Sequence, residues 1–346
     1  MKKIKVFLVL ICMLLSGCMN HDQKDKTNLS QEKESLQIGM SFDSFVIERW
    51  QRDRDVFVST AKEFGAVVNV RSANGDVETQ ISQIEYFIEK RMDAIIIICI
   101  DMDQLKGVVQ KAKDANIKVV AYDRLIRNAD VDLYISFDNE AVGTMMAQAI
   151  VGQDLEKKKV LMIGGPLTDL NVTMVESGFC KVMEEAKIEL VGNFHAAGWK
   201  PELASVYIDS NSTFLEEVDA IMCGNDSLAG QVVYSLAERR LAGKVYVVGQ
   251  DADLEACQRI VEGTQLMTVY KPVEKLAQKA AEYTIKLIKG EELEETQTID
   301  DGTYDVPYVT LETIAVTEDN MMEVIINSSF HLKEDVYLNV PDKMPE

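Results

Sequence analysis

Apolar residues follow two alternating patterns along this chain. Short runs rich in Ile, Val and Leu occupy residues 36–42, 66–72, 93–100, 117–123 and 133–139. Between them lie stretches with apolar residues at helical spacing, such as 77–90 and 104–115. Nearly continuous apolar runs predict strands buried on both faces, which is typical of parallel sheets covered by helices.

The same alternation continues after residue 139. It predicts strands at 159–165, 189–195, 219–226, 244–251 and 265–272, a helix at 273–289 and a last strand near 309–316. One sheet with this many strands would be unusually large, so we predict an α/β fold with two doubly wound parallel-sheet lobes. The helix and the last strand would cross back between the lobes, which gives a three-segment hinge.

The expected boundaries follow from these crossings. Residues 36–137 plus 273–302 form the first lobe, and residues 138–272 plus 303–333 form the second. Residues 334–346 show no regular pattern and are expected to be an irregular tail.

The N-terminus predicts export from the cytoplasm. Three lysines precede an apolar run at 6–15, which is followed by Leu-Ser-Gly-Cys at 15–18. The run is short for a membrane-spanning helix, and the arrangement is typical of a secretion signal. The last four residues resemble a bacterial lipobox, so we expect a signal peptide at 1–17 and a lipidated Cys18; an uncleaved anchor helix is the alternative. The polar residues 18–35 read as a flexible tether, and a lipid anchor favours a Gram-positive source.

Charge and cysteine usage limit the classes of protein to which the chain can belong. The chain of 346 residues is 47% hydrophobic, which is enough for two domains with real cores. Its net charge is −21, and loss of the signal peptide would remove three lysines and no acid. Such a surface repels phosphate backbones, which argues against nucleic-acid binding. Cys99, Cys180, Cys223 and Cys257 form no C-x-x-C pair and are expected to be buried apolar residues; a disulfide is the less favoured reading.

The start of the first helix combines an aromatic ring with a guanidinium group. Trp50 follows Arg49 and lies seven residues before Phe57, so it could begin a buried stripe. However, the bridging positions Asp53 and Arg54 are charged, which interrupts that stripe. Trp50 is therefore either a core residue or an aromatic side chain that faces a partly polar cavity.

Polar residues follow most of the predicted strands. In open α/β sheets ligands bind beyond the carboxyl ends of the strands. Carboxylates, amides and cations together suit a neutral sugar, whose hydroxyls both donate and accept, and an indole ring can cover its C–H face. The residues at these ends are Asp43, Asp123, Arg124, Asp138, Asn139, Asn225, Asp226, Asp251 and Lys271, with Trp50 and Trp199 as the only tryptophans.

Catalysis is poorly supported. The only histidines are His21, His195 and His331, and no G-x-S-x-G or H-E-x-x-H motif occurs. The Gly-Gly-Pro stretch at 164–166 lacks the pattern of a nucleotide loop. Asp251 and Asp253 could be proposed as a glycosidase pair, but an acidic chain offers many such pairs by chance. We therefore expect no catalytic residue, no cofactor and no metal.

Several long motifs resemble the family of bacterial D-xylose-binding proteins in the type I periplasmic-binding-protein superfamily. They include ERWQRDRDVFV, KVVAYDRLIRNADVDLYISFDNE, GQDADL and GTQLMTVYKPV, and the similarity covers about residues 36–331. The resemblance implies a receptor that captures D-xylose, or a close pentose or aldose, and delivers it to the permease of an ABC importer. The implied sugar contacts are Arg49, Trp50, Arg124, Asp138, Asn139, Trp199, Asn225, Asp251 and Lys271.

Some positions depart from the family pattern. The segment 99–101 is less polar than expected, and Ala197 replaces an acidic residue. The segment 167–171 holds fewer amides than the family pattern, so Asn171 is only a weak candidate. These departures leave the exact sugar preference open. The signal and lipobox stand where related repressors carry a DNA-binding motif, which excludes that class. The alternative role is a sensor subunit that reports xylose to a membrane histidine kinase; neighbouring genes would separate the two roles.

Overall fold

The computed structural model of the chain describes residues 35–294 and 296–345. The predicted signal peptide, Cys18 and all but Ser35 of the tether lie outside the described residues. Leu36–Glu346 form a unit distinct from Met1–Ser35. Within this unit the chain builds two α/β lobes, each around its own sheet.

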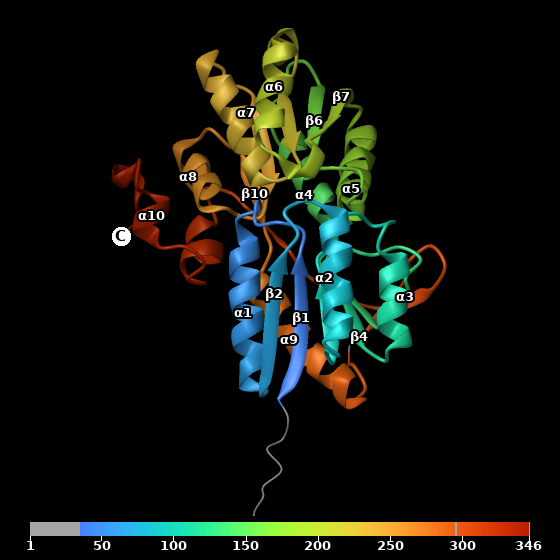
Figure 1. The fold of residues 1–346 in the computed structure, drawn as a ribbon. Coiled ribbons are helices and arrows are strands. Elements are labelled where there is room, and N and C mark those ends of the chain that lie inside the picture. The colour runs from blue at the N-terminus through green and yellow to red at the C-terminus, as the bar shows by residue number, and fades with distance from the viewer. Residues whose placement is uncertain (1–34, 295, 346) are drawn as a thin grey trace, which may run out of the picture. The chain divides into compact units, whose positions relative to one another are not determined.

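The first lobe has a seven-stranded sheet with the order β11-β12-β5-β4-β3-β1-β2, in which only β11 runs antiparallel to its neighbour. Figure 1 shows β1 and β2 of this sheet side by side, with α1 next to them. The alternating elements of this lobe are β1 (Leu36–Phe42), α1 (Arg49–Glu63), β2 (Ala66–Ser72), α2 (Val77–Glu89), β3 (Ala94–Ile97), α3 (Lys106–Asp114), β4 (Lys118–Tyr122) and β5 (Leu133–Phe137). They are joined later in the chain by α9 (Val273–Lys289), β11 (Gln297–Asp300) and β12 (Asp305–Leu311).

The second lobe has a six-stranded sheet with the order β13-β10-β9-β8-β6-β7, in which only β13 is antiparallel to its neighbour. Its elements are α4 (Asn139–Val151), β6 (Lys159–Gly164), α5 (Leu170–Ala186), β7 (Glu189–His195), α6 (Glu202–Ser210), β8 (Ala220–Cys223), α7 (Asp226–Glu238), β9 (Tyr246–Gln250), α8 (Leu254–Glu262), β10 (Met267–Tyr270) and β13 (Ile314–Val316).

The continuous apolar runs are explained by burial on both faces of the central strands. In β3, Ile95 and Ile97 pack in one cluster with residues of α2 and α3, whereas Ile96 packs in another with residues of α1 and α9. Because successive side chains of a strand point to opposite faces, both sets must be apolar.

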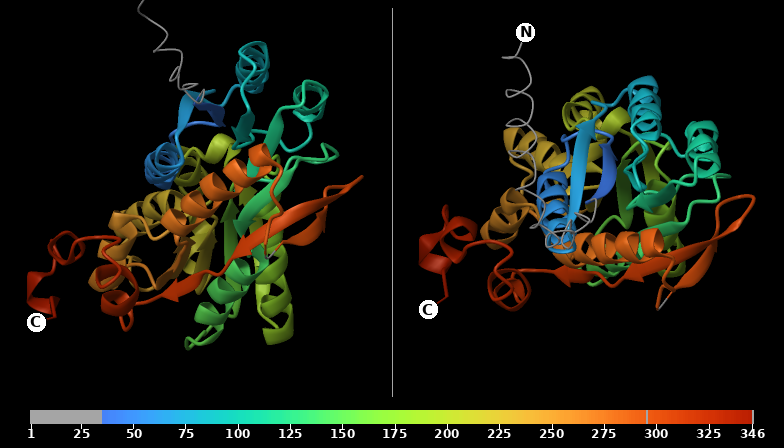
Figure 2. Two further views of the ribbon diagram at one scale, coloured as in Figure 1. Left: turned by 90° about the horizontal axis from the view of Figure 1, so that it is seen from below. Right: turned by 60° about the horizontal axis from the view of Figure 1, so that its bottom comes forward.

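Three segments connect the lobes, as the fold prediction required. The chain passes from β5 into α4 at Asp138, from β10 into α9 at residues 271–272, and from β12 into β13 at residues 312–313. The last passage can be followed in Figure 2, where the orange-red strand leaves its hairpin and runs on toward the C-terminus.

Three details differ from the expectations. Strand β12 extends the first sheet beside β5, whereas residues from 303 onward were assigned to the second lobe, and β11 was not predicted. The sequence Gln-Thr-Ile-Asp of β11 is largely exposed, so it carries no apolar run. The tail 334–346 is not wholly irregular: α10 (Lys333–Val336) packs against α8, with Val336 and Tyr337 buried.

Candidate functional site

A small enclosed cavity lies at the carboxyl ends of the strands of both lobes. It contains about 320 Å³ of empty space, including any that is open to solvent. Carboxyl ends of parallel strands are where α/β sheets usually bind ligands. The cavity is lined by Ile47, Arg49, Trp50, Asp123 and Arg124 from the first lobe, by Asp169, Asn171, Trp199, Asn225, Gln250 and Asp251 from the second, and by Lys271 at a crossing.

Arg49 is fixed by two carboxylates. Its Nη1 lies 2.9 Å from Asp123 Oδ2, and its Nη2 donates to Asp53 Oδ1 at 2.9 Å. Its guanidinium carbon also lies 4.5 Å from the centroid of the Trp50 ring. The first turn of α1 therefore presents a charge-compensated arginine beside an indole.

Arg124 joins the two lobes. Its Nη1 donates to Asp43 Oδ2 at 2.8 Å and to the carbonyl oxygen of Cys99 at 3.1 Å. Its Nε lies 2.7 Å from Asp169 Oδ2 of the second lobe. Asn171 adds a second link, because its amide nitrogen donates to Asp123 Oδ1 at 3.1 Å. The lobes are therefore in contact around the cavity in this structure.

The loop after β9 holds Asp251 in a backbone conformation that side chains rarely adopt. Asp251 has φ +98° and Ala252 has φ +54°. Behind the loop, the Ala252 N–H donates to Thr268 Oγ1, which in turn donates to Asp226 Oδ2 at 2.6 Å. Non-glycine residues with positive φ persist only where the surroundings enforce them, and such strain clusters at functional sites. Lys271 Nζ lies 3.3 Å from Asp251 Oδ1.

Glycines make room for the second indole. Trp199 donates from Nε1 to Asp169 Oδ2 at 3.2 Å. A Cβ at Gly165 would lie 2.4 Å from the ring of Trp199, and one at Gly224 would lie 3.2 Å from it. Gly165 after β6 and Gly224 after β8 therefore leave room for an aromatic side chain, consistent with the rejection of the stretch at 164–166 as a nucleotide loop.

Two buried polar atoms of lining residues have no hydrogen-bond or ion-pair partner in the described part of the chain. They are Trp50 Nε1 and Gln250 Oε1. Unmet buried polar atoms are rare because each costs about 1–3 kcal/mol. Their clustering indicates a ligand that donates and accepts hydrogen bonds.

The charges that line the cavity are balanced. Three cations, Arg49, Arg124 and Lys271, face three carboxylates, Asp123, Asp169 and Asp251. Burial raises the pKa of Asp123, but the neighbouring Arg49, Lys271 and Arg124 outweigh it, and the net pKa is lowered. For Asp169 burial prevails over Arg124, and the pKa is raised.

Seven of the nine predicted contact residues line the cavity: Arg49, Trp50, Arg124, Trp199, Asn225, Asp251 and Lys271. Asp138 is not part of the lining: it is exposed, and its carboxylate caps α4 by accepting from Ala141 N at 2.9 Å. Asn139 is buried in the first turn of α4 but is also outside the lining.

Sequence reasoning missed or underrated some lining residues. Asp123 was noted at a strand end but not selected, Asn171 was a weak candidate, and Asp169, Gln250 and Ile47 were not considered. Asp169 and Asn171 lie in the segment that departs from the family pattern, so their neighbours gave no guide. The polar end of β9 could have indicated Gln250.

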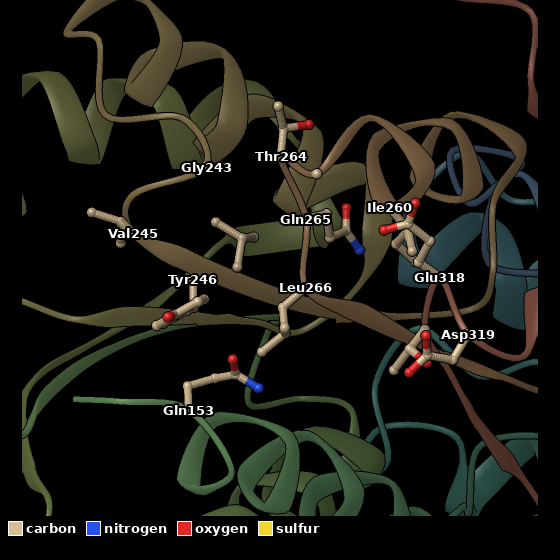
Figure 3. Close-up of a pocket in the computed structure, with 13 residues that line it drawn as sticks. Gln153, Gly243, Val245, Tyr246, Ile260, Thr264, Gln265, Leu266, Glu318 and Asp319 are labelled. Carbon is tan, nitrogen blue, oxygen red and sulfur yellow. The ribbon is translucent and has the colours of Figure 1, made fainter. Parts of the chain in front are cut away.

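A larger groove lies elsewhere on the second lobe, at the amino ends of β9 and β10 (Figure 3). It spans about 790 Å³, including space open to solvent, and its lining includes Gln153, Tyr246, Thr264 and Glu318. None of the buried unpartnered atoms found in the described residues belongs to its lining. The enclosed cavity between the lobes is therefore the better candidate site.

Other possible sites are not supported within residues 35–294 and 296–345. No cluster of three or more His, Cys, Asp or Glu side chains is arranged to hold a metal ion there. In the same range, no helix has both the length and the apolar character to cross a membrane. Cys99, Cys223 and Cys257 are buried free thiols, as predicted, and Cys180 is a half-buried one.

Comparison with known proteins agrees with this geometry. The model of the periplasmic binding protein domain matches residues 38–292. The chain belongs to the periplasmic binding protein family. It is 44% identical to the D-xylose-binding periplasmic protein of Haemophilus influenzae over 89% of this chain and 94% of that protein, and 40% identical to the one of Escherichia coli over 96% and 100%. Membership of this family places the protein outside the cytoplasm.

Solved structures of transporter solute-binding proteins share the fold. The protein from Clostridium phytofermentans, solved with bound β-D-glucose, has a TM-score of 0.79 and 28% identity over 87% of this chain and 99% of its own. The protein from Chloroflexus aurantiacus, solved with D-glucose, has a TM-score of 0.80 and 25% identity over 87% and 98%. The two-lobe type I fold is therefore confirmed.

Proposed function

We propose that this protein captures D-xylose between its lobes and delivers it to the permease of an ABC importer. The observation that carries the proposal is a closed cavity with balanced charges and buried polar atoms that lack partners. Each hydroxyl of a neutral sugar can accept from Trp50 Nε1 or a guanidinium and donate to Gln250 Oε1 or a carboxylate. The two relatives above, both D-xylose-binding periplasmic proteins, support xylose as the ligand.

Binding would be coupled to closure. Arg49 and Trp50 come from the first lobe, whereas Gln250, Asp251 and Trp199 come from the second. Neither lobe has a full set of partners, so a sugar gains contacts in the closed form that the open form cannot make. The closed form is then the species that the permease would recognise.

The role we propose is not catalytic. The four proteins compared above are named for binding or transport, and none is named as an enzyme or for signalling through a kinase. Attachment through a lipidated Cys18 also remains a proposal, supported by the sequence at 15–18 alone. A Gram-positive source follows only from that anchor, since both xylose-binding relatives come from Gram-negative bacteria.

Calorimetry with purified protein tests the function. D-xylose should bind at micromolar affinity or tighter, equivalent to about −8 kcal/mol or better. D-ribose, which points one hydroxyl the other way, should bind at least about tenfold more weakly, because a misplaced hydroxyl leaves buried polar groups unpaired. Equal affinity for the two pentoses, or no heat from either, would refute the assignment.

A further inference from the structure

Two segments that include the positions 99–101 and 167–171 meet each other across the lobes. Residues 99–103 follow β3 in the first lobe, and residues 166–171 join β6 to α5 in the second. The Met102 N–H donates to the carbonyl oxygen of Thr168 at 3.0 Å. The Thr168 hydroxyl donates to the carbonyl oxygen of Ile100 at 3.2 Å. Two hydrogen bonds thus connect the same pair of loops.

Apolar packing reinforces these bonds. Leu170, the first residue of α5, is half-buried and packs against the hydrophobic cluster of the first lobe. That cluster includes Leu105, Leu125 and Ile126, and apart from Leu170 it is made of residues of the first lobe. A partly buried leucine of one lobe therefore packs against the core of the other.

These contacts are separate from the cavity. Met102, Thr168 and Leu170 are absent from its lining, although Asp169 and Asn171 between and beside them belong to it. A sugar bound in the cavity would therefore not touch these contacts. They stabilise the closed arrangement itself, whichever ligand it contains.

We infer that residues 99–103 and 166–171 form a clasp that sets the equilibrium between open and closed lobes. This inference rests on the proposed function. If only the closed form holds sugar tightly, the apparent dissociation constant is the intrinsic one divided by the closed fraction. Weakening the clasp then raises the dissociation constants of all sugars by one common factor. Thr168 and Leu170 determine affinity without touching the ligand, and they leave selectivity unchanged.

The test compares the wild type with the double variant Thr168→Val and Leu170→Ala. The valine keeps the shape of threonine but loses the hydroxyl donor, and the alanine removes most of the side chain that packs against the first-lobe core. The matched control is Thr173→Val with Leu190→Ala. Thr173 lies on the same helix and bonds within it, to Leu170 O, while Leu190 is 37% exposed on β7.

Calorimetry should show dissociation constants for xylose and ribose that are both raised at least about fivefold in the clasp variant, by the same factor. Stopped-flow fluorescence should place most of the change in faster release. The control should bind both sugars like the wild type. The sugar-free melting temperature checks folding; if the double variant does not fold, Thr168→Val alone, at an exposed position, should still weaken both sugars about twofold or more.

The outcomes separate the two proposals. A wild type that binds neither pentose refutes the function. A wild type that binds xylose, together with a clasp variant that binds it equally tightly, refutes the clasp alone. Weaker binding of only one of the two sugars would also refute the clasp, because that result indicates a contact within the cavity. A common loss with preserved selectivity supports it.

Discussion

The indole nitrogen of Trp50 offers the sharpest test of the cavity. Trp50 is 1% exposed, packs near Phe42 and Ile47, and lines the cavity. Its Nε1 is buried with no partner in the described residues. If a sugar hydroxyl accepts from this atom, Trp50→Phe removes one hydrogen bond while an aromatic ring remains against the same neighbours.

The expected loss follows from the value of one such bond. A typical hydrogen bond contributes about 0.5–1.5 kcal/mol net, which corresponds to about a two- to thirteenfold rise in the dissociation constant. Trp199→Phe is the matched control, because it shortens the other indole, whose N–H already donates to Asp169. Both variants lose the same ring area, but only Trp50→Phe removes an N–H that has no acceptor among the described residues.

Calorimetry with xylose and thermal unfolding without sugar make the measurement. Trp50→Phe should bind more weakly than the wild type and unfold at nearly the same temperature. If it binds as tightly as the wild type, Trp50 is a core residue and its nitrogen has no ligand partner. If Trp50→Phe loses most of its stability, the indole ring is needed mainly for folding.

Three further predictions concern other parts of the chain. Asp251→Ala should weaken xylose binding by on the order of 2 kcal/mol or more in calorimetry, because it leaves Lys271 and a sugar hydroxyl unpartnered; an unchanged affinity would exclude Asp251 from the site. Burial raises the pKa of Asp226 to about 7, so the protonated carboxyl stabilises the folded state and this stability is lost as pH rises from about 4 to 7. Denaturant unfolding should show a free energy of unfolding that falls less steeply with pH in Asp226→Asn than in the wild type. An unchanged dependence on pH would contradict this prediction. Cys18→Ser should release the protein from the membrane without altering xylose binding, and normal membrane retention in cell fractions would refute the lipobox reading.

The sequence was most informative where local pattern and burial coincide. The bounds expected for β1 and α9 match those observed, because each is a run whose apolar residues face a covered layer. Strands β8 and β10 are shorter than predicted, because the expected ranges included polar residues on either side of each apolar run. The exposed hairpin strand β11 has no such run, and periodicity could not reveal it.

Contacts between residues of different lobes could not be predicted from the sequence. Arg124 and Asp169 lie far apart in the chain, and no periodicity relates a residue after β4 to one before α5. The same holds for Met102 and Thr168 in the clasp. The departures at 99–101 and 167–171 were visible individually, but their proximity became visible only in the fold.

The interruption of the apolar stripe in α1 has a structural cause. The sequence placed a charge at Asp53, where support for a core tryptophan was expected, and so left two roles open for Trp50. In the structure Asp53 is fully buried and accepts two hydrogen bonds from Arg49, whose other side reaches Asp123. A buried carboxylate is tolerated only with such partners. The break in the stripe therefore marks the ion pair that holds Arg49 toward the cavity, and Trp50 packs on the core with one part while bordering the cavity with another.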